Sequence, residues 1–129
     1  MLPEQLNALA RQTLDAAYQV HTTLGPGLLE SAYTACLVHE LRLLGLEVRT
    51  EVPVPLVYKG ERMTETGFRI DVLVANELVV EVKSLEAIAP VHLSQLVTYL
   101  KLSDRRLGLL LNFNVASLRD RIYRRVNRF

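Results

Sequence analysis

Residues 67–83 of this 129-residue chain read Gly-Phe-Arg-Ile-Asp-Val-Leu-Val-Ala-Asn-Glu-Leu-Val-Val-Glu-Val-Lys. Valine, isoleucine and leucine dominate both halves of this segment, and a polar turn around Asn76 separates them. The pattern predicts two adjacent β-strands, over residues 68–74 and 78–83. Burying a charge costs free energy unless it pairs with an opposite charge or binds a metal. The segment is therefore also the first place to look for chemistry, because two carboxylates and one lysine lie inside its apolar strands: Asp71, Glu81 and Lys83.

The turn between these strands decides whether the two acids share a face of the sheet. A slip of one residue in the register moves every side chain of a strand to the other face. Asp71 and Glu81 share a face only if Val74 pairs with Leu78, which leaves a three-residue turn. Such a turn needs a positive φ at its second or third residue, or a bulge. A two-residue turn would place the two acids on opposite faces.

Apolar periodicity predicts the elements that precede this hairpin. Two helices are expected, over residues 3–23 and 28–44, with Gly25-Pro26-Gly27 as the break between them. Short strands are then expected at residues 48–52 and 56–58, with a turn at Lys59-Gly60. Prolines at positions 53 and 55 are typical of a strand at a sheet edge.

After the hairpin we expect a helix over residues 91–102 and a strand over 107–113 that is buried on both faces. Asn114 would cap a last helix in which most arginines face outward and three apolar residues face inward, Leu118, Ile122 and Val126. The element order α-α-β-β-β-β-α-β-α predicts one α/β domain over residues 1–129, with a mixed central sheet flanked by helices.

Composition excludes several classes of protein. Half of the residues are hydrophobic and 22% are charged, which fits neither a disordered chain nor a coiled coil. The only cysteine, Cys36, excludes an intramolecular disulfide and a multi-cysteine zinc site. No apolar run approaches membrane-spanning length and no secretory signal is visible, so we expect a cytoplasmic protein. A mean hydropathy of +0.17 suggests a homodimer, formed through residues 48–58 or the first helix.

Charge is unevenly distributed along the chain. Residues 105–129 contain seven arginines and a single acid, Asp120, although the net charge of the whole chain is only +1. Arginines on the outer face of a last helix could contact nucleic-acid phosphates. The alternative is that they simply solvate that face.

The charged residues of the hairpin suggest metal chemistry. Glu81 and Lys83 are two residues apart and share a strand face, where they could form no more than a surface ion pair. The upstream Asp71 favours a site, because two converging carboxylates suit Mg²⁺ or Mn²⁺ and a lysine beside them can stabilise charge on a phosphoryl oxygen. Acids held close together should raise the pKa of at least one of them until a cation binds.

This order of an acid followed by Glu-x-Lys resembles the PD-(D/E)XK nuclease superfamily, whose core runs α-β-β-β-α-β. Residues 27–33, Gly-Leu-Leu-Glu-Ser-Ala-Tyr, also match the GxxExxY pattern that names a family of small bacterial proteins within that superfamily. The likeness extends through residues 41–46, 52–60, 90–100 and 109–115. It implies a nuclease-like core over residues 25–129 and an additional N-terminal helix over residues 1–24.

The resemblance also implies roles for individual residues. Asp71 and Glu81 match the metal-binding carboxylates, Lys83 the catalytic lysine, and Glu30 an acid that supports the metal or its waters. Gln95 resembles a polar residue that some members carry on the helix after the Glu-x-Lys strand. Phe68 is a departure, since many relatives have tyrosine there. From the residues alone, Glu30 could equally be a carboxylate stabilised at a helix N-terminus.

The function expected is a Mg²⁺- or Mn²⁺-dependent nuclease that hydrolyses phosphodiester bonds of a nucleic acid, DNA in the first instance. Two alternatives remain open. One is a non-catalytic module that binds nucleic acid or protein and retains the nuclease fold, and the other is a metal-dependent enzyme acting on a small phosphorylated molecule.

Overall fold

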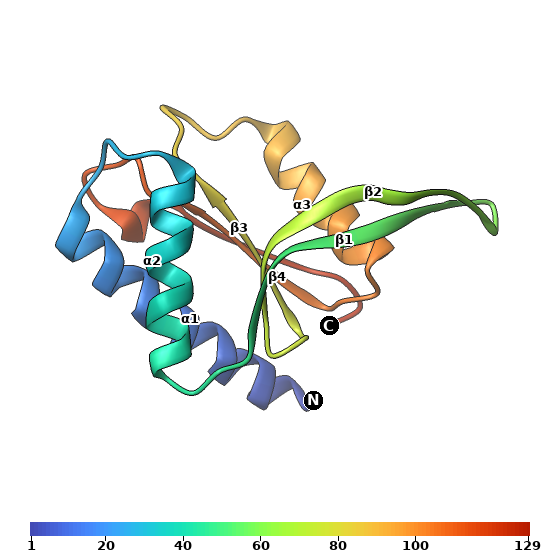
Figure 1. The fold of residues 1–129 in the computed structure, drawn as a ribbon, viewed down its shortest axis with the longest axis horizontal. Coiled ribbons are helices and arrows are strands. Elements are labelled where there is room, and N and C mark those ends of the chain that lie inside the picture. The colour runs from blue at the N-terminus through green and yellow to red at the C-terminus, as the bar shows by residue number, and fades with distance from the viewer.

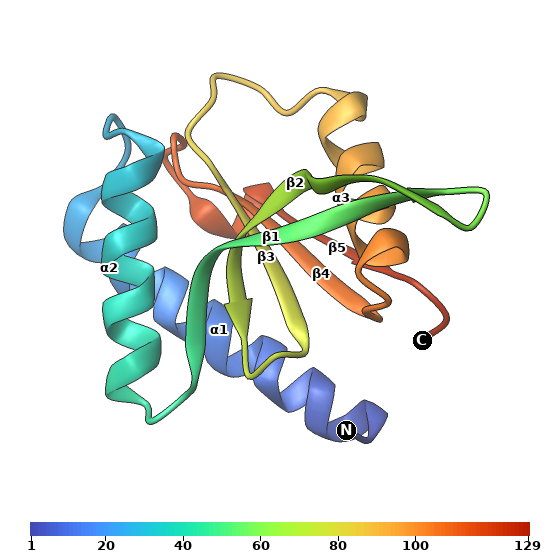
Figure 2. The same ribbon diagram turned by 45° about the vertical axis from the view of Figure 1, so that its right-hand side comes forward.

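The computed structural model describes all 129 residues as a five-stranded sheet between two layers of helices. Helices α1 (Pro3–Leu24) and α2 (Glu30–Leu43) cover one face, and α3 (Pro90–Leu102) covers the other (Figures 1 and 2). The larger core joins α1 and α2 to the sheet through side chains such as Val80 and Leu109, and the smaller core joins α3 to it through Val79 and Leu110. The expected mixed α/β fold is confirmed.

Strand order follows chain order, β1-β2-β3-β4-β5. Strands β3 and β4 are parallel and are connected by α3, whereas the other neighbouring pairs are antiparallel. The elements from α2 to β4 therefore give the expected α-β-β-β-α-β core, with α1 before it and β5 after it. The strands are β1 (Val48–Tyr58), β2 (Glu61–Val74), β3 (Leu78–Lys83), β4 (Leu107–Asn112) and β5 (Ile122–Val126).

The central strands β3 and β4 are buried on both faces, as the apolar run at residues 107–113 predicts. Helix α3 approaches β4 closely at Gly108, where an added Cβ would lie 2.7 Å from Leu96 Cδ1. The absence of a side chain at this position lets the helix rest directly on the strand. This packing fixes α3 on β4, the parallel neighbour of the strand that carries Glu81 and Lys83.

The hairpin register is the one expected from the positions of the two acids. Val74 pairs with Leu78, and the three-residue turn has positive φ at Ala75 (52°) and Asn76 (59°). The ladder between β2 and β3 covers only the pairs from Val74–Leu78 to Val72–Val80. Beyond it the two strands diverge, and Asp71 and Glu81 lie at that point of divergence.

Strands β1 and β2 continue together beyond the body of the molecule as a two-stranded arm, residues 55–67 (Figure 1). The prediction of a separate strand at residues 56–58 was wrong, because β1 continues through these residues with register shifts at Leu56. The second strand also begins at Glu61, well before the expected residue 68. The predicted turn at Lys59-Gly60 is confirmed, as is the position of β1 at a sheet edge.

The predicted last helix is also wrong. Residues Leu118–Arg121 form a single turn of 3₁₀-helix, η1, and Ile122–Val126 form β5, which pairs antiparallel with β4. A spacing of four residues places side chains on one face of either a helix or a strand, so the apolar pattern fits both. The edge of β4 decides between them, because pairing with β5 satisfies backbone groups that would otherwise be left unpaired.

Asn114 does not cap a helix either. Its side-chain oxygen accepts a hydrogen bond from Gly27 N (3.1 Å), which connects the end of β4 to the loop before α2.

No helix in the structure combines the length and the apolar character that crossing a bilayer requires.

Candidate metal centre

The structure brings Asp71 and Glu81 together where β2 separates from β3. Asp71 Oδ2 accepts a hydrogen bond from the backbone N–H of Val82 (2.9 Å), so the side chain takes the place of a ladder partner that β2 no longer supplies. Glu81 lies on the adjacent strand, where the charge of the Asp71 carboxyl acts on it. The result is a pair of adjacent carboxyl groups at the diverging strands.

Glu81 is buried in a way that is unusual for a carboxylate. Only 5% of the residue is exposed, and its Oε1 atom has no hydrogen-bond partner. Burial, reinforced by the neighbouring Asp71, raises the pKa of Glu81 from 4.5 to about 9, and the positive charge of Lys83 only partly offsets this shift. The expectation that one acid has a raised pKa is confirmed, although desolvation contributes more than repulsion between the acids.

The backbone of β1 is irregular directly beside this pair. Thr50 pairs with Val72 and Val52 pairs with Ile70, but Glu51 between them has φ of 51° and has no partner in the ladder. A non-glycine residue in the left-handed region is strained by roughly 1–3 kcal/mol, and such strain is frequent at functional sites. Glu51 also lines the cleft that contains Asp71.

A cleft of about 610 Å³ lies between α2 and the strands and contains both Glu30 and Asp71. Glu30 is the first residue of α2, and its Oε2 accepts a hydrogen bond from the backbone N–H of Ser84 (3.4 Å). Glu30 is exposed, in contrast to Glu81. The structure thus places Glu30 at the cleft without placing it in the carboxylate pair.

The Gly-x-x-Glu-x-x-Tyr pattern builds the loop that leads to Glu30. Tyr33 is fully buried, donates a hydrogen bond to Gly25 O (2.6 Å) and accepts one from Leu28 N (3.2 Å). Its ring stacks on Phe113 at 4.7 Å between centroids. The tyrosine therefore holds the loop before α2 against the end of β4, and this fixes the position of Glu30 at the start of α2.

Two polar residues that the sequence interpretation did not select support the same region. Ser84 donates from its hydroxyl to Leu28 O (2.5 Å) and from its backbone to Glu30. Asn112 is fully buried, and its amide both accepts from Leu85 N and donates to Leu85 O, each at 3.0 Å. Asn112 could have been found from the sequence, because it is a polar residue inside an apolar strand, as Asp71 is.

Lys83 and Gln95 occupy the side of the sheet covered by α3. Lys83 is half-buried at the end of β3, and its charge acts on Glu81. Gln95 is exposed on α3, and its side chain has no hydrogen bond within the protein. One turn further along, the Tyr99 ring stacks on Phe68 at 4.0 Å, and burial together with the charges of Glu81 and Asp71 raises the pKa of Tyr99. On α3, Tyr99 is therefore the residue on which the charges of the acid pair act, and Gln95 makes no contact with that pair.

The donor set fits a divalent cation in part. Two carboxylates and an unpartnered buried oxygen are the ligands that Mg²⁺ or Mn²⁺ prefers, and a cation would offset the cost of burying Glu81. No group of three or more His, Cys, Asp or Glu side chains is placed to hold a metal ion. Asp71 and Glu81 could therefore hold a cation directly, whereas Glu30 is in a position to contact only its waters.

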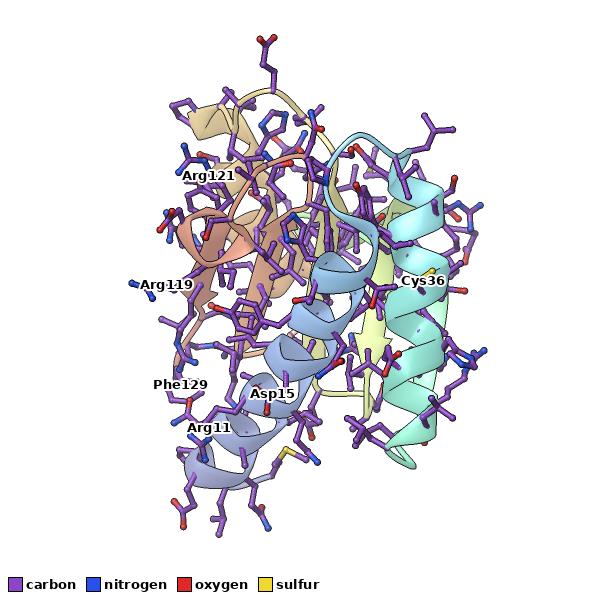
Figure 3. All side chains as sticks on the ribbon, turned by 90° about the vertical axis from the view of Figure 1, so that its left-hand side faces the viewer. Arg11, Asp15, Cys36, Arg119, Arg121 and Phe129 are labelled. Atoms are coloured by element: carbon purple, nitrogen blue, oxygen red, sulfur yellow. The ribbon has the colours of Figure 1, made fainter.

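The C-terminal arginines are not gathered near this centre. Strands β3 and β4 lie between β5 and β2. Arg124 and Arg125 are neighbours on β5, so they point to opposite faces of the sheet, and Arg124 donates to Asn7 of α1 (2.7 Å). Arg119 and Arg121 project on the side of α1 that is turned away from α2 (Figure 3). The expected single basic helix face does not exist.

Comparison with known proteins places the chain in a family. The family model described as the PD-(D/E)XK nuclease superfamily matches residues 7–126, which is nearly the whole chain. Neither the search of curated proteins nor the search of solved structures gave a match. On the family match, the chain belongs to the PD-(D/E)XK nuclease superfamily.

Proposed function

We propose that this member of the PD-(D/E)XK nuclease superfamily hydrolyses phosphodiester bonds of a nucleic acid with Mg²⁺ or Mn²⁺. The observation that carries the proposal is the carboxylate pair of Asp71 and Glu81, in which a buried oxygen of Glu81 has no partner. A purely structural role would not keep a carboxylate in this position, because an unpaired buried polar group costs about 1–3 kcal/mol. Occupancy by a cation removes that cost.

Each predicted site residue has a role in this proposal. Asp71 and Glu81 would hold the cation, which when bound would acidify a water and neutralise charge on the phosphate. Lys83 is on the same strand face as Glu81, from which its ammonium would stabilise negative charge that develops on a phosphoryl oxygen. Glu30 would orient a water across the cleft, and Gln95 would orient a water or a phosphate from α3.

One observation favours a binding module as the second candidate function. The arm formed by β1 and β2 exposes apolar side chains on a two-stranded ribbon, and an isolated hairpin is only marginally stable in water. These side chains are Leu56, Val57, Tyr58 and Met63, of which Tyr58 is 59% exposed. A partner that covers the arm would stabilise it.

That partner could be a second copy of the chain, so the homodimer belongs to the same proposal. Prolines at positions 53 and 55 lack an N–H, and β1 is therefore a poor edge for adding another strand. The dimer would instead use the side-chain faces of the arm. We also propose that the polymer is DNA and that residues 1–129 form a single domain. The proposal further includes a cytoplasmic location and membership of the GxxExxY family.

The test is a cleavage assay on single- and double-stranded DNA and RNA, with Mg²⁺, Mn²⁺ or a chelator. Asp71→Asn and Lys83→Ala should each abolish metal-dependent cleavage, and only Asp71→Asn should also abolish metal binding. Asp15→Asn on α1 (Figure 3) and Lys101→Ala on α3 are matched controls, since both side chains are exposed and lie outside the site. Cleavage that persists in the Asp71 and Lys83 variants would refute the assignment, and metal binding without any cleavage would favour the binding module.

A further inference from the structure

A second charged site lies at the opposite end of the sheet from the candidate metal centre. It is a pocket of about 340 Å³ with no hydrophobic lining residue, and we call it the arginine pocket. It lies beside the turn between β2 and β3 and the start of β4, whereas Asp71 and Glu81 lie toward the other end of β3. Its lining consists of Glu77, Asp104, Arg105, Arg106 and Arg128.

Arg105 is held rigidly in this pocket. Its guanidinium donates to Asn76 O (3.2 Å), to Asn76 Oδ1 (2.8 Å) and to Ser103 O (3.3 Å). The side chain is half-buried, and burial together with the charge of Arg49 lowers its pKa. These contacts use neutral acceptors, so they fix the direction of the guanidinium without cancelling its charge.

Positive charge exceeds negative charge around the pocket. Arg128 forms an ion pair with Asp104, but neither Arg105 nor Arg106 has a carboxylate within ion-pair distance. Arg106 donates only to the backbone oxygen of Met1. Arg49, on the neighbouring strand β1, is exposed and also has no ion-pair partner. Glu77 also lines the pocket and pairs with the amino group of Met1 (4.0 Å), so three guanidinium groups form no ion pair of their own.

We propose that the arginine pocket binds a phosphate group. Guanidinium groups present paired N–H donors that match phosphate oxygens, and a pocket without apolar lining suits a wholly polar anion. An anion would also relieve the mutual repulsion of Arg49 and Arg105. The pocket is separate from the metal centre, because the four residues from Glu77 to Glu81 along β3 span about 13 Å. The proposal goes beyond the proposed nuclease activity and does not depend on it.

The phosphate could belong to a free phosphorylated molecule or to a nucleic-acid strand. The first measurement is a titration of the wild-type chain with inorganic phosphate, followed by the arginine side-chain N–H signals in NMR. Binding should saturate and should shift the Arg105 signal. Arg106→Ala should weaken it about tenfold, the loss expected for one charge-assisted hydrogen bond. Arg121→Ala removes an exposed arginine outside the pocket and should leave the affinity unchanged.

Absence of saturable binding, or equal weakening by Arg106→Ala and Arg121→Ala, would overturn the proposal. Arg49→Ala is the second variant, because the exposed side chain of Arg49 makes no hydrogen bond and its loss should leave the fold intact. Loss of affinity in Arg49→Ala with an unchanged melting temperature would support the pocket even if Arg106→Ala folds poorly.

A second titration identifies the source of the phosphate. It uses a thymidine oligonucleotide of about twelve nucleotides and the Asp71→Asn chain, so that no cleavage can intervene. If the pocket contacts a strand, adding Arg106→Ala should lower the slope of log affinity against log salt by about one. If the slope is unchanged while inorganic phosphate still loses affinity, the pocket serves a free phosphorylated molecule. Failure of the nuclease assay would affect neither measurement.

Discussion

Two acids of the proposed site, one on the sheet and one on α2, are in opposite situations. On the sheet, Glu81 is 5% exposed and has an oxygen without a partner, and its pKa is raised to about 9. On α2, Glu30 is exposed and accepts a hydrogen bond from Ser84. Folding removes the Glu81 carboxyl from water, which costs free energy, whereas the Glu30 carboxyl stays exposed to water. A charge that is expensive to bury is stronger evidence for a ligand site than a charge that merely lies nearby.

The largest expected effect comes from removing the charge of the buried acid, Glu81. Glu81→Gln should stabilise the metal-free protein at pH 7 by up to about 3 kcal/mol, because glutamine does not ionise and so avoids the raised pKa of Glu81. It should also abolish the rise in melting temperature on adding Mn²⁺. Urea unfolding with and without Mn²⁺ measures both effects.

Glu61→Gln is the matched control, since Glu61 is exposed on the arm and forms no ion pair. If the Glu81→Gln chain is less stable than wild type at pH 7 and its melting temperature still rises with Mn²⁺, Glu81 is neither costly to bury nor a metal ligand.

The same contrast predicts how stability depends on pH. Folded Glu81 keeps its proton up to about pH 9, whereas in the unfolded chain it loses the proton near pH 4.5. The folded state therefore binds the additional proton between these values, and its stability should fall as pH rises, by about 1.4 kcal/mol per unit at most. Below pH 4.5 and above about pH 9 this contribution should be constant. The difference between wild-type and Glu81→Gln unfolding curves across pH isolates it, and a difference that does not vary with pH would contradict the burial argument.

Metal binding should show the reverse dependence on pH. A cation must displace the proton of Glu81, so its affinity should rise up to about tenfold per pH unit between pH 6 and 8. Calorimetry in buffers of different ionisation enthalpy should show about one proton released per ion bound. An affinity that is independent of pH would mean that the ion binds elsewhere.

The acid pair of the sheet could be predicted from sequence, and the surroundings of Glu30 could not. Asp71 and Glu81 stand out as charges in apolar strands, and the period of two along a strand turns their positions into a register that the structure confirms. The contacts around Glu30 depend on residues far apart in sequence. Ser84 reaches Leu28 across 56 residues, and Asn114 reaches Gly27 across 87. Local sequence patterns do not predict such long-range contacts.

The C-terminal segment was predicted wrongly for a related reason. Its apolar spacing of four residues is satisfied by both helix and strand, and the choice depends on whether β4 has a free edge. That is a property of the assembled sheet rather than of residues 114–126. The long arm was missed likewise, since its two strands support each other beyond the body of the molecule.

The loop before α2 should show an intermediate effect. Tyr33→Phe removes a buried hydroxyl that contacts Gly25 O and Leu28 N, and it should lower the free energy of unfolding by about 1–2 kcal/mol. Tyr58→Phe, on the exposed arm, is the control and should change it by less than about 0.5 kcal/mol. If the two variants are equally stable, the tyrosine does not hold the loop, and the position of Glu30 needs another cause.

The smallest expected effect belongs to Glu30 itself. Glu30→Gln should lower stability by no more than about 1 kcal/mol, since it removes one exposed carboxylate from the first turn of a helix. Metal affinity should fall only severalfold, because Glu30 would contact the waters of the ion rather than the ion. If Glu30 orients a water, the cleavage rate should fall by a larger factor than the metal affinity. If Glu30 acts by its charge alone, the two should fall by the same factor. Comparing the affinity from calorimetry with the cleavage rate at saturating Mn²⁺ separates these roles, and a complete loss of metal binding would show that Glu30 is a direct ligand and that the two sides of the cleft close on the ion together.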